Sequence, residues 1–126
     1  MVPENLKYTD QHEWVRVEGD TAVVGITDYA QGELGDIVYV ELPLVGSSTA
    51  VKKAFGVVEA VKTVSDLYAP VSGQVTAVNE GLATDAVVVN KSPYDEGWMI
   101  KIKMSNPSDV DSLLSPAEYK KLIGKE

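Results

Sequence analysis

The sequence predicts a mainly β domain with short helices, built as a sandwich or a barrel. Short runs rich in valine, isoleucine and tyrosine recur along the chain. Glycine, proline, asparagine or aspartate stands between most of these runs and favours turns there. Helical patterns are confined to short segments. The 126 residues suit one domain, which we expect to span residues 1–126, with a core at about 13–104 and a C-terminal helical appendage at about 106–124.

The first third of the chain predicts a hairpin, a short helix and a strand. Residues 13–26 hold two apolar runs separated by a turn sequence and therefore form a hairpin. Thr27 or Asp28 can cap a short helix that ends near residues 32–35, where glycines stop it. Residues 36–43 form the next strand, which the proline at its end terminates.

The middle and later parts of the chain predict further strands. Residues 44–53 are expected as a loop or a weak strand, and 74–81 as a strand that ends in turn residues. The region that follows leaves two possibilities open: Asp85 could begin a helix through Val89, or the three consecutive valines could form a strand. Residues 98–104 alternate apolar side chains with lysine, which indicates a half-exposed strand with its lysines outward.

The C-terminal end is predicted to be helical. Asn106-Pro107 opens one short helix, and "SPAE" at 115–118 is a capping box with proline at the first helical position. Leucine, tyrosine and isoleucine side chains give these helices an apolar stripe, which can pack on the sheet.

Residues 55–69, "FGVVEAVKTVSDLYA", favour a β-strand along their whole length but place Lys62 near the middle. Strands usually run about 3 to 10 residues, and an ammonium group is costly to bury, so we expect the chain to reverse at Lys62. Its neighbours Val61, Thr63 and Val64 are β-branched and oppose a turn. Such a conflict between local preference and fold is typical of functional sites. We therefore interpret Lys62 as the exposed tip of a hairpin.

Composition and charge exclude several classes of function. The chain has no cysteine, which excludes disulfides, zinc–thiolate sites and thiol chemistry by its own side chains. His12 is its one histidine, so a multi-histidine metal site is excluded as well and no metal is expected. The net charge of −8 repels phosphate backbones. Neither a signal peptide nor an apolar run of roughly 20 residues is present. We expect a cytoplasmic protein that binds neither nucleic acid nor membrane.

Four motifs follow one another along most of the chain. They are "YTDQHEW", "VGITDYAQGELGDIVYVELP", "VEAVKTVSDLYAPVSGQV" and "VNKSPYDEGWMIKIK". In this order, from about Lys7 to Ile123 and without large insertions, they resemble the glycine cleavage system H protein family, whose members are lipoyl carriers. Four motifs in sequence are far more specific than a single lysine in a turn.

The resemblance implies a fold and a set of site residues. The fold is a barrel-sandwich hybrid, the lipoyl-domain-like arrangement of two small sheets with a modified lysine on an exposed hairpin. Lys62 is the implied attachment point of lipoic acid, held as N6-lipoyllysine. Glu13 and Asp66 match positions that line a cleft for the loaded arm. Glu59, three residues before the lysine, and His12 are further candidates for recognition or for the cleft.

The resemblance also implies a carrier without catalytic residues of its own. The lipoyl group takes the aminomethyl group of glycine from a pyridoxal-phosphate-dependent glycine decarboxylase to a tetrahydrofolate-dependent aminomethyltransferase. A dihydrolipoamide dehydrogenase with FAD and NAD then reoxidises the dithiol. A lipoyl-attaching enzyme loads the carrier, which is expected to be a monomer.

The neighbours of the lysine depart from the usual family pattern. Ala60 stands where serine is common, and Thr63 and Val64 replace smaller residues. A biotin carrier would favour methionines beside the lysine, whereas Val61 and Thr63 flank it here, so biotin is the less favoured cargo. Two other functions stay open: relay of lipoyl groups to other carriers, and an unmodified domain that acts as a protein-interaction module.

Overall fold

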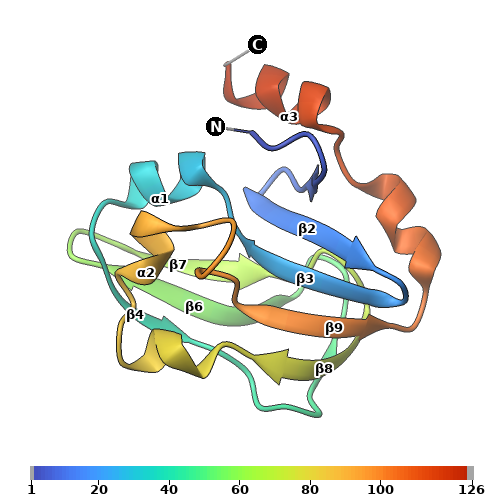
Figure 1. Cartoon of the computed structure of the whole chain (residues 1–126), viewed down its shortest axis with the longest axis horizontal. Helices are drawn as coiled ribbons and strands as arrows, with labels where there is room; N and C mark the ends of the chain where they lie inside the picture. Colours follow the sequence, from blue (N-terminus) through green and yellow to red (C-terminus); the bar gives the residue numbers. More distant parts are fainter. Residues whose placement is uncertain (1, 125–126) are drawn as a thin grey trace.

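The computed structural model describes residues 2–124 and consists mainly of antiparallel strands (Figure 1). One sheet has the strand order β1-β2-β3-β9-β8-β5, and a second has the order β4-β6-β7. The strands are β1 (Lys7–Tyr8), β2 (Glu13–Glu18), β3 (Thr21–Ile26), β4 (Ile37–Glu41), β5 (Ser48–Thr49), β6 (Ala54–Ala60), β7 (Val64–Tyr68), β8 (Gly73–Val78) and β9 (Ile100–Met104). The helical segments are α1 (Asp28–Leu34), η1 (Glu80–Ala83), α2 (Val88–Lys91), η2 (Pro107–Ser112) and α3 (Pro116–Ile123).

The two sheets share one apolar core. Alternate side chains of each strand point inward, so the large sheet contributes Val24 and Ile102 and the small sheet contributes Val58 and Leu67 to the same buried cluster. Strand β9, which follows β8 in the sequence, lies between β3 and β8 in the large sheet (Figure 1). This arrangement confirms the predicted mainly β fold, a barrel-sandwich hybrid with short helices.

The predicted hairpin and first helix are confirmed. Strands β2 and β3 pair with Glu13 opposite Ile26. Thr27 caps α1, since its hydroxyl oxygen accepts a hydrogen bond from the Ala30 amide at 3.1 Å. The helix stops at Gly35, whose φ of 82° is strained for any side chain.

The region after β8 matches neither of the two predicted structures, a helix from Asp85 through Val89 or a strand of valines. Its valines do not form a strand, and the helix is α2, which begins at Val88, three residues later than Asp85. The one-turn helix places Val89 in the core with 0% exposure, so packing overrides the β preference of valine. Residues 44–53 contain the short strand β5, as a weak strand was expected. Strand β9 points Lys103 outward and buries Ile102, as its alternation predicted.

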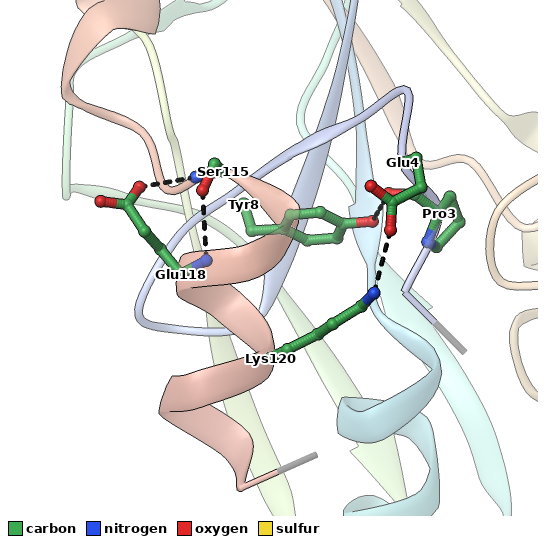
Figure 2. A network of polar contacts seen from close by, with 6 residues as sticks. All are labelled: Pro3, Glu4, Tyr8, Ser115, Glu118 and Lys120. Atoms are coloured by element: carbon green, nitrogen blue, oxygen red, sulfur yellow. Dashed lines mark hydrogen bonds and ion pairs between the residues drawn. The ribbon is translucent and has the colours of Figure 1, made fainter. Parts of the chain in front are cut away.

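The C-terminal helix α3 packs beside the N-terminal segment (Figure 2). Ser115 and Glu118 form the predicted capping box. Tyr119 stacks on Tyr8 of β1 with ring centroids 4.6 Å apart, and Lys120 pairs with Glu4 at 2.9 Å. The exposed ion pair adds little stability, so the buried tyrosines hold the two ends together.

No helix within residues 2–124 is long and apolar enough to cross a bilayer. The expected division into a core at about 13–104 and an appendage at about 106–124 stays a prediction.

Candidate functional site

The chain reverses at Val61 and Lys62, between β6 and β7, as the sequence predicted. The Ala60 amide donates to the Thr63 carbonyl at 2.8 Å, which leaves Val61 and Lys62 as the two central residues of a tight turn. Both are exposed, and Val61 is 75% exposed. Within residues 2–124 the Lys62 ammonium makes no ion pair. The turn therefore presents an amine to solvent at the tip of the small sheet.

A cleft of about 250 Å³ lies between α1 and the β6–β7 hairpin. One wall comes from α1 and the other from the small sheet, and residues 11–13, where β2 begins, also line the cleft. The lining residues are Gln11, His12, Glu13, Ile26, Tyr29, Ala30, Glu33, Leu34, Val58, Ser65, Asp66 and Leu67. The apolar side chains suit a hydrocarbon chain, and the acidic side chains suit a cation.

Glu13 is a buried acid at this cleft, with 2% exposure. Its Oε1 accepts a hydrogen bond from the Thr9 hydroxyl at 2.5 Å, and its Oε2 accepts one from the Tyr68 amide at 3.2 Å. Burial nevertheless raises the pKa of Glu13 to about 7, because desolvation outweighs both bonds. The group can thus exist as acid or carboxylate near neutral pH, and a nearby cation would favour the carboxylate.

His12 forms part of the same wall and is tied to the C-terminal helix. Its Nδ1 lies 2.8 Å from the Tyr119 hydroxyl, which lies 2.7 Å from the Thr27 hydroxyl. Burial lowers the pKa of His12, so the neutral imidazole is favoured. The residue adopts a left-handed φ of 71°, and its carbonyl accepts from the Thr27 amide at 3.0 Å. The wall of the cleft is therefore fixed by contacts from three separate parts of the chain.

The structure brings together three of the five candidate residues. His12, Glu13 and Asp66 all line the cleft. Lys62 lies at the tip of the turn, with its Cε 3.5 Å from where a side chain on Gly35 would begin. Glu59 lies outside the cleft, exposed and paired with Val64. Two residues that hold the site were not among the candidates: Thr9, whose hydroxyl donates to the Glu13 carboxylate, and Tyr119, whose hydroxyl contacts His12.

A family model described as Glycine cleavage H-protein matches residues 6–126. The chain belongs to the glycine cleavage H-protein family. Glycine cleavage system H proteins of Chlorobaculum tepidum and Staphylococcus carnosus are each 56% identical to it, over 126 and 124 residues, and each comparison covers 98% of both chains. The crystal structure of a glycine cleavage system H protein from Mycobacterium marinum matches with a TM-score of 0.90 at 38% identity, covering 98% of this chain and 99% of that chain.

Membership of this family relates the exposed amine of Lys62 to the cleft that lies beside it. Proteins of the glycine cleavage H-protein family are lipoyl carriers, and the two-sheet fold described above matches that of the solved family member. In such a carrier the protein supplies position and environment, while the bound group supplies the chemistry.

Proposed function

We propose that this chain carries lipoic acid on Lys62, as N6-lipoyllysine, within the glycine cleavage system. The observation that carries the proposal is an unpaired amine at the tip of a hairpin beside a cleft that a buried acid, Glu13, helps to line. The partners are a pyridoxal-phosphate-dependent glycine decarboxylase, a tetrahydrofolate-dependent aminomethyltransferase and a dihydrolipoamide dehydrogenase. The chain itself contributes no catalytic residue and delivers the aminomethyl group of glycine from the first partner to the second.

The dimensions of the hairpin support this attachment. Asp66 lies four positions after Lys62 in the chain, so the Cα atoms of the two residues are at most about 14 Å apart. A lysine side chain joined to a lipoyl chain contains about twelve bonds of roughly 1.5 Å and reaches about 15 Å as an extended zigzag. A lipoyl group on Lys62 is thus long enough to reach Asp66, one of the acidic residues that line the cleft.

We assign the cleft residues to the bound cargo. An ammonium group in the cleft would donate charge-assisted hydrogen bonds to the carboxylates of Glu13 and Asp66. Each such contact is worth about 1.5–3 kcal/mol when it is desolvated. The ammonium charge would lower the pKa of Glu13 and hold that group as a carboxylate. His12 shapes the wall beside it. Glu59, on the exposed face of the small sheet, is assigned to recognition by the lipoyl-attaching enzyme.

The lack of cysteine supports a carrier of a reactive disulfide. A lipoyl group when bound supplies a disulfide that can be reduced and reoxidised. Any thiolate nearby could attack it and form a mixed disulfide. This chain has no thiol, so it cannot trap its own cofactor.

The test is the mass of the protein made in cells supplied with lipoate. Modification of Lys62 blocks tryptic cleavage there, so a lipoyl increment should appear on the peptide spanning residues 54–91. Lys62→Arg should abolish the increment and glycine turnover while changing stability by less than about 0.5 kcal/mol, as for other exposed sites. Lys103→Arg, also exposed, is the matched control and should stay fully modified.

Three outcomes would overturn the proposal. A biotinyl increment would replace the chemistry, and an unmodified Lys62 beside fully lipoylated carriers would favour an interaction module. Full lipoylation without turnover in a mixture with the partner enzymes would favour relay of lipoyl groups to other carriers.

A further inference from the structure

The turn that carries Lys62 is not stabilised by its own sequence. Its central residues are Val61 and Lys62, both with negative φ, and β-branched Thr63 follows. None of these residues favours a tight turn. A contact from outside the hairpin supports it: the Val61 amide donates to the carbonyl of Asp36 at 3.0 Å. In Figure 1 the turn lies beside the chain that descends from α1 to β4.

The segment that supplies this contact, Gly35 to Ile37, is itself held by Asn90 of α2. The Asn90 Oδ1 accepts from the Ile37 amide at 2.9 Å. Its Nδ2 donates to the Gly35 carbonyl at 2.9 Å and to the Gln31 side chain at 2.8 Å. Both protons of the amide and its oxygen are engaged. The backbone N–H of Ile37 can only donate and the carbonyl of Gly35 can only accept, so these two partners allow one orientation of the Asn90 side-chain amide.

The same segment contacts the lysine side chain. Gly35 has φ 82° and ψ −152°, a conformation that only glycine adopts readily. A Cβ atom on Gly35 would lie 3.5 Å from Cε and 4.0 Å from Nζ of Lys62. The methylene groups of Lys62 thus lie against the backbone of Gly35, which has no side chain. The position of the Lys62 side chain therefore depends on where Asn90 holds Gly35.

We infer that Asn90 is a positioning residue for Lys62: through residues 35–37 it holds the turn in the form that a lipoyl-attaching enzyme acylates. This inference rests on the proposed function. In the step concerned, the Lys62 ammonium loses a proton to a base of the attaching enzyme. The free amine then forms an amide with the carbonyl carbon of an activated lipoyl group, whose leaving group departs with its bonding electron pair, and a second proton leaves the nitrogen. Asn90 takes no part in this chemistry.

The test compares Asn90→Ala with Asn79→Ala. Asn79 is a matched control because its Nδ2 also donates two hydrogen bonds, here to the backbone carbonyls of Glu96 and Trp98, both at 2.8 Å. The two variants should lose similar stability in urea unfolding. In Asn90→Ala alone, the Val61 amide should exchange with deuterium about tenfold faster, because its acceptor segment has lost its anchor.

The second readout is the rate of acylation by purified lipoyl-attaching enzyme. Asn90→Ala should lower kcat/KM for attachment about tenfold, since displacement of a reacting group by a fraction of an ångström slows reaction, while Asn79→Ala should match the wild type. Equal attachment by the two variants, or unchanged exchange at Val61, would overturn the inference. If the wild type itself is not acylated, the proposed function fails, and exchange at Val61 still decides whether Asn90 holds the turn.

Discussion

Replacement of Glu13 by glutamine should stabilise the protein at pH 8 by about 3 kcal/mol. Glu13 is 2% exposed, and burial raises its pKa from 4.5 to about 7. The difference of about 2.5 in pKa corresponds to about 3 kcal/mol, at about 1.4 kcal/mol for each unit of pKa. This is the free energy that the folded state loses when the buried acid must ionise.

The direction follows from proton binding in the two states. A folded-state pKa above the unfolded value means that the folded chain binds the proton more tightly. The contribution of Glu13 to stability is therefore present in full below about pH 4.5 and is lost as the pH rises through about 7. Glutamine mimics the protonated acid at every pH, because its carbonyl can accept from Tyr68 and its amide can face the Thr9 hydroxyl.

The assay is urea unfolding of the wild type and Glu13→Gln at a series of pH values from 4.5 to 8. At each pH, the difference between the free energies of unfolding of the two proteins isolates the contribution of Glu13, since the other titrating groups are common to both. It should be near zero at pH 4.5 and grow to about 3 kcal/mol at pH 8. Asp66→Asn is the control, because Asp66 is exposed in the same cleft and its loss should change stability by less than about 0.5 kcal/mol. A pH-independent difference for Glu13→Gln would refute the reasoning.

Two further substitutions test the packing around the site, both by urea unfolding. Gly73→Ala should destabilise the protein by about 3 kcal/mol or more, because the new Cβ would overlap the backbone carbonyl oxygen of Lys103 in β9 and one strand must move. An effect below about 1 kcal/mol would contradict this contact. Tyr119→Phe should lower the free energy of unfolding by about 1–3 kcal/mol, because it leaves His12 and buried Thr27 without the hydroxyl that they share. A titration of this variant followed by nuclear magnetic resonance should also show a changed pKa for His12. An unchanged pKa would argue against the hydrogen bond between His12 and Tyr119.

The turn at Lys62 could be predicted because the conflict that reveals it is local. A strand of fifteen residues with a lysine at its centre must break, and the break point follows from burial alone. The capping box before α3 is local too, since Ser115 and Glu118 lie within one helical turn. The place of Glu13 at the cleft was expected from family resemblance alone, because a single acid in a strand gives no sign of what will cover it.

The contacts that hold the site could not be predicted, because they join distant parts of the chain. His12 and Tyr119 are 107 residues apart, and Asn90 reaches Ile37 across 53 residues. No periodicity or spacing links such pairs. The shift of α2 to Val88 has the same origin, since core packing, a tertiary effect, decided between helix and strand.

The place of β9 in the large sheet sets a limit on when the native turn can exist during synthesis. Residues 100–104 are synthesised after the turn, yet they pair with both β3 and β8. The small sheet depends on the large one for the other half of its core. Domains with such non-local pairing fold in roughly milliseconds to seconds, whereas the ribosome adds only about 5–20 residues per second. An enzyme that recognises only the folded turn would therefore find it only after residues 100–104 have also been synthesised, and not on a nascent chain that ends just beyond Lys62.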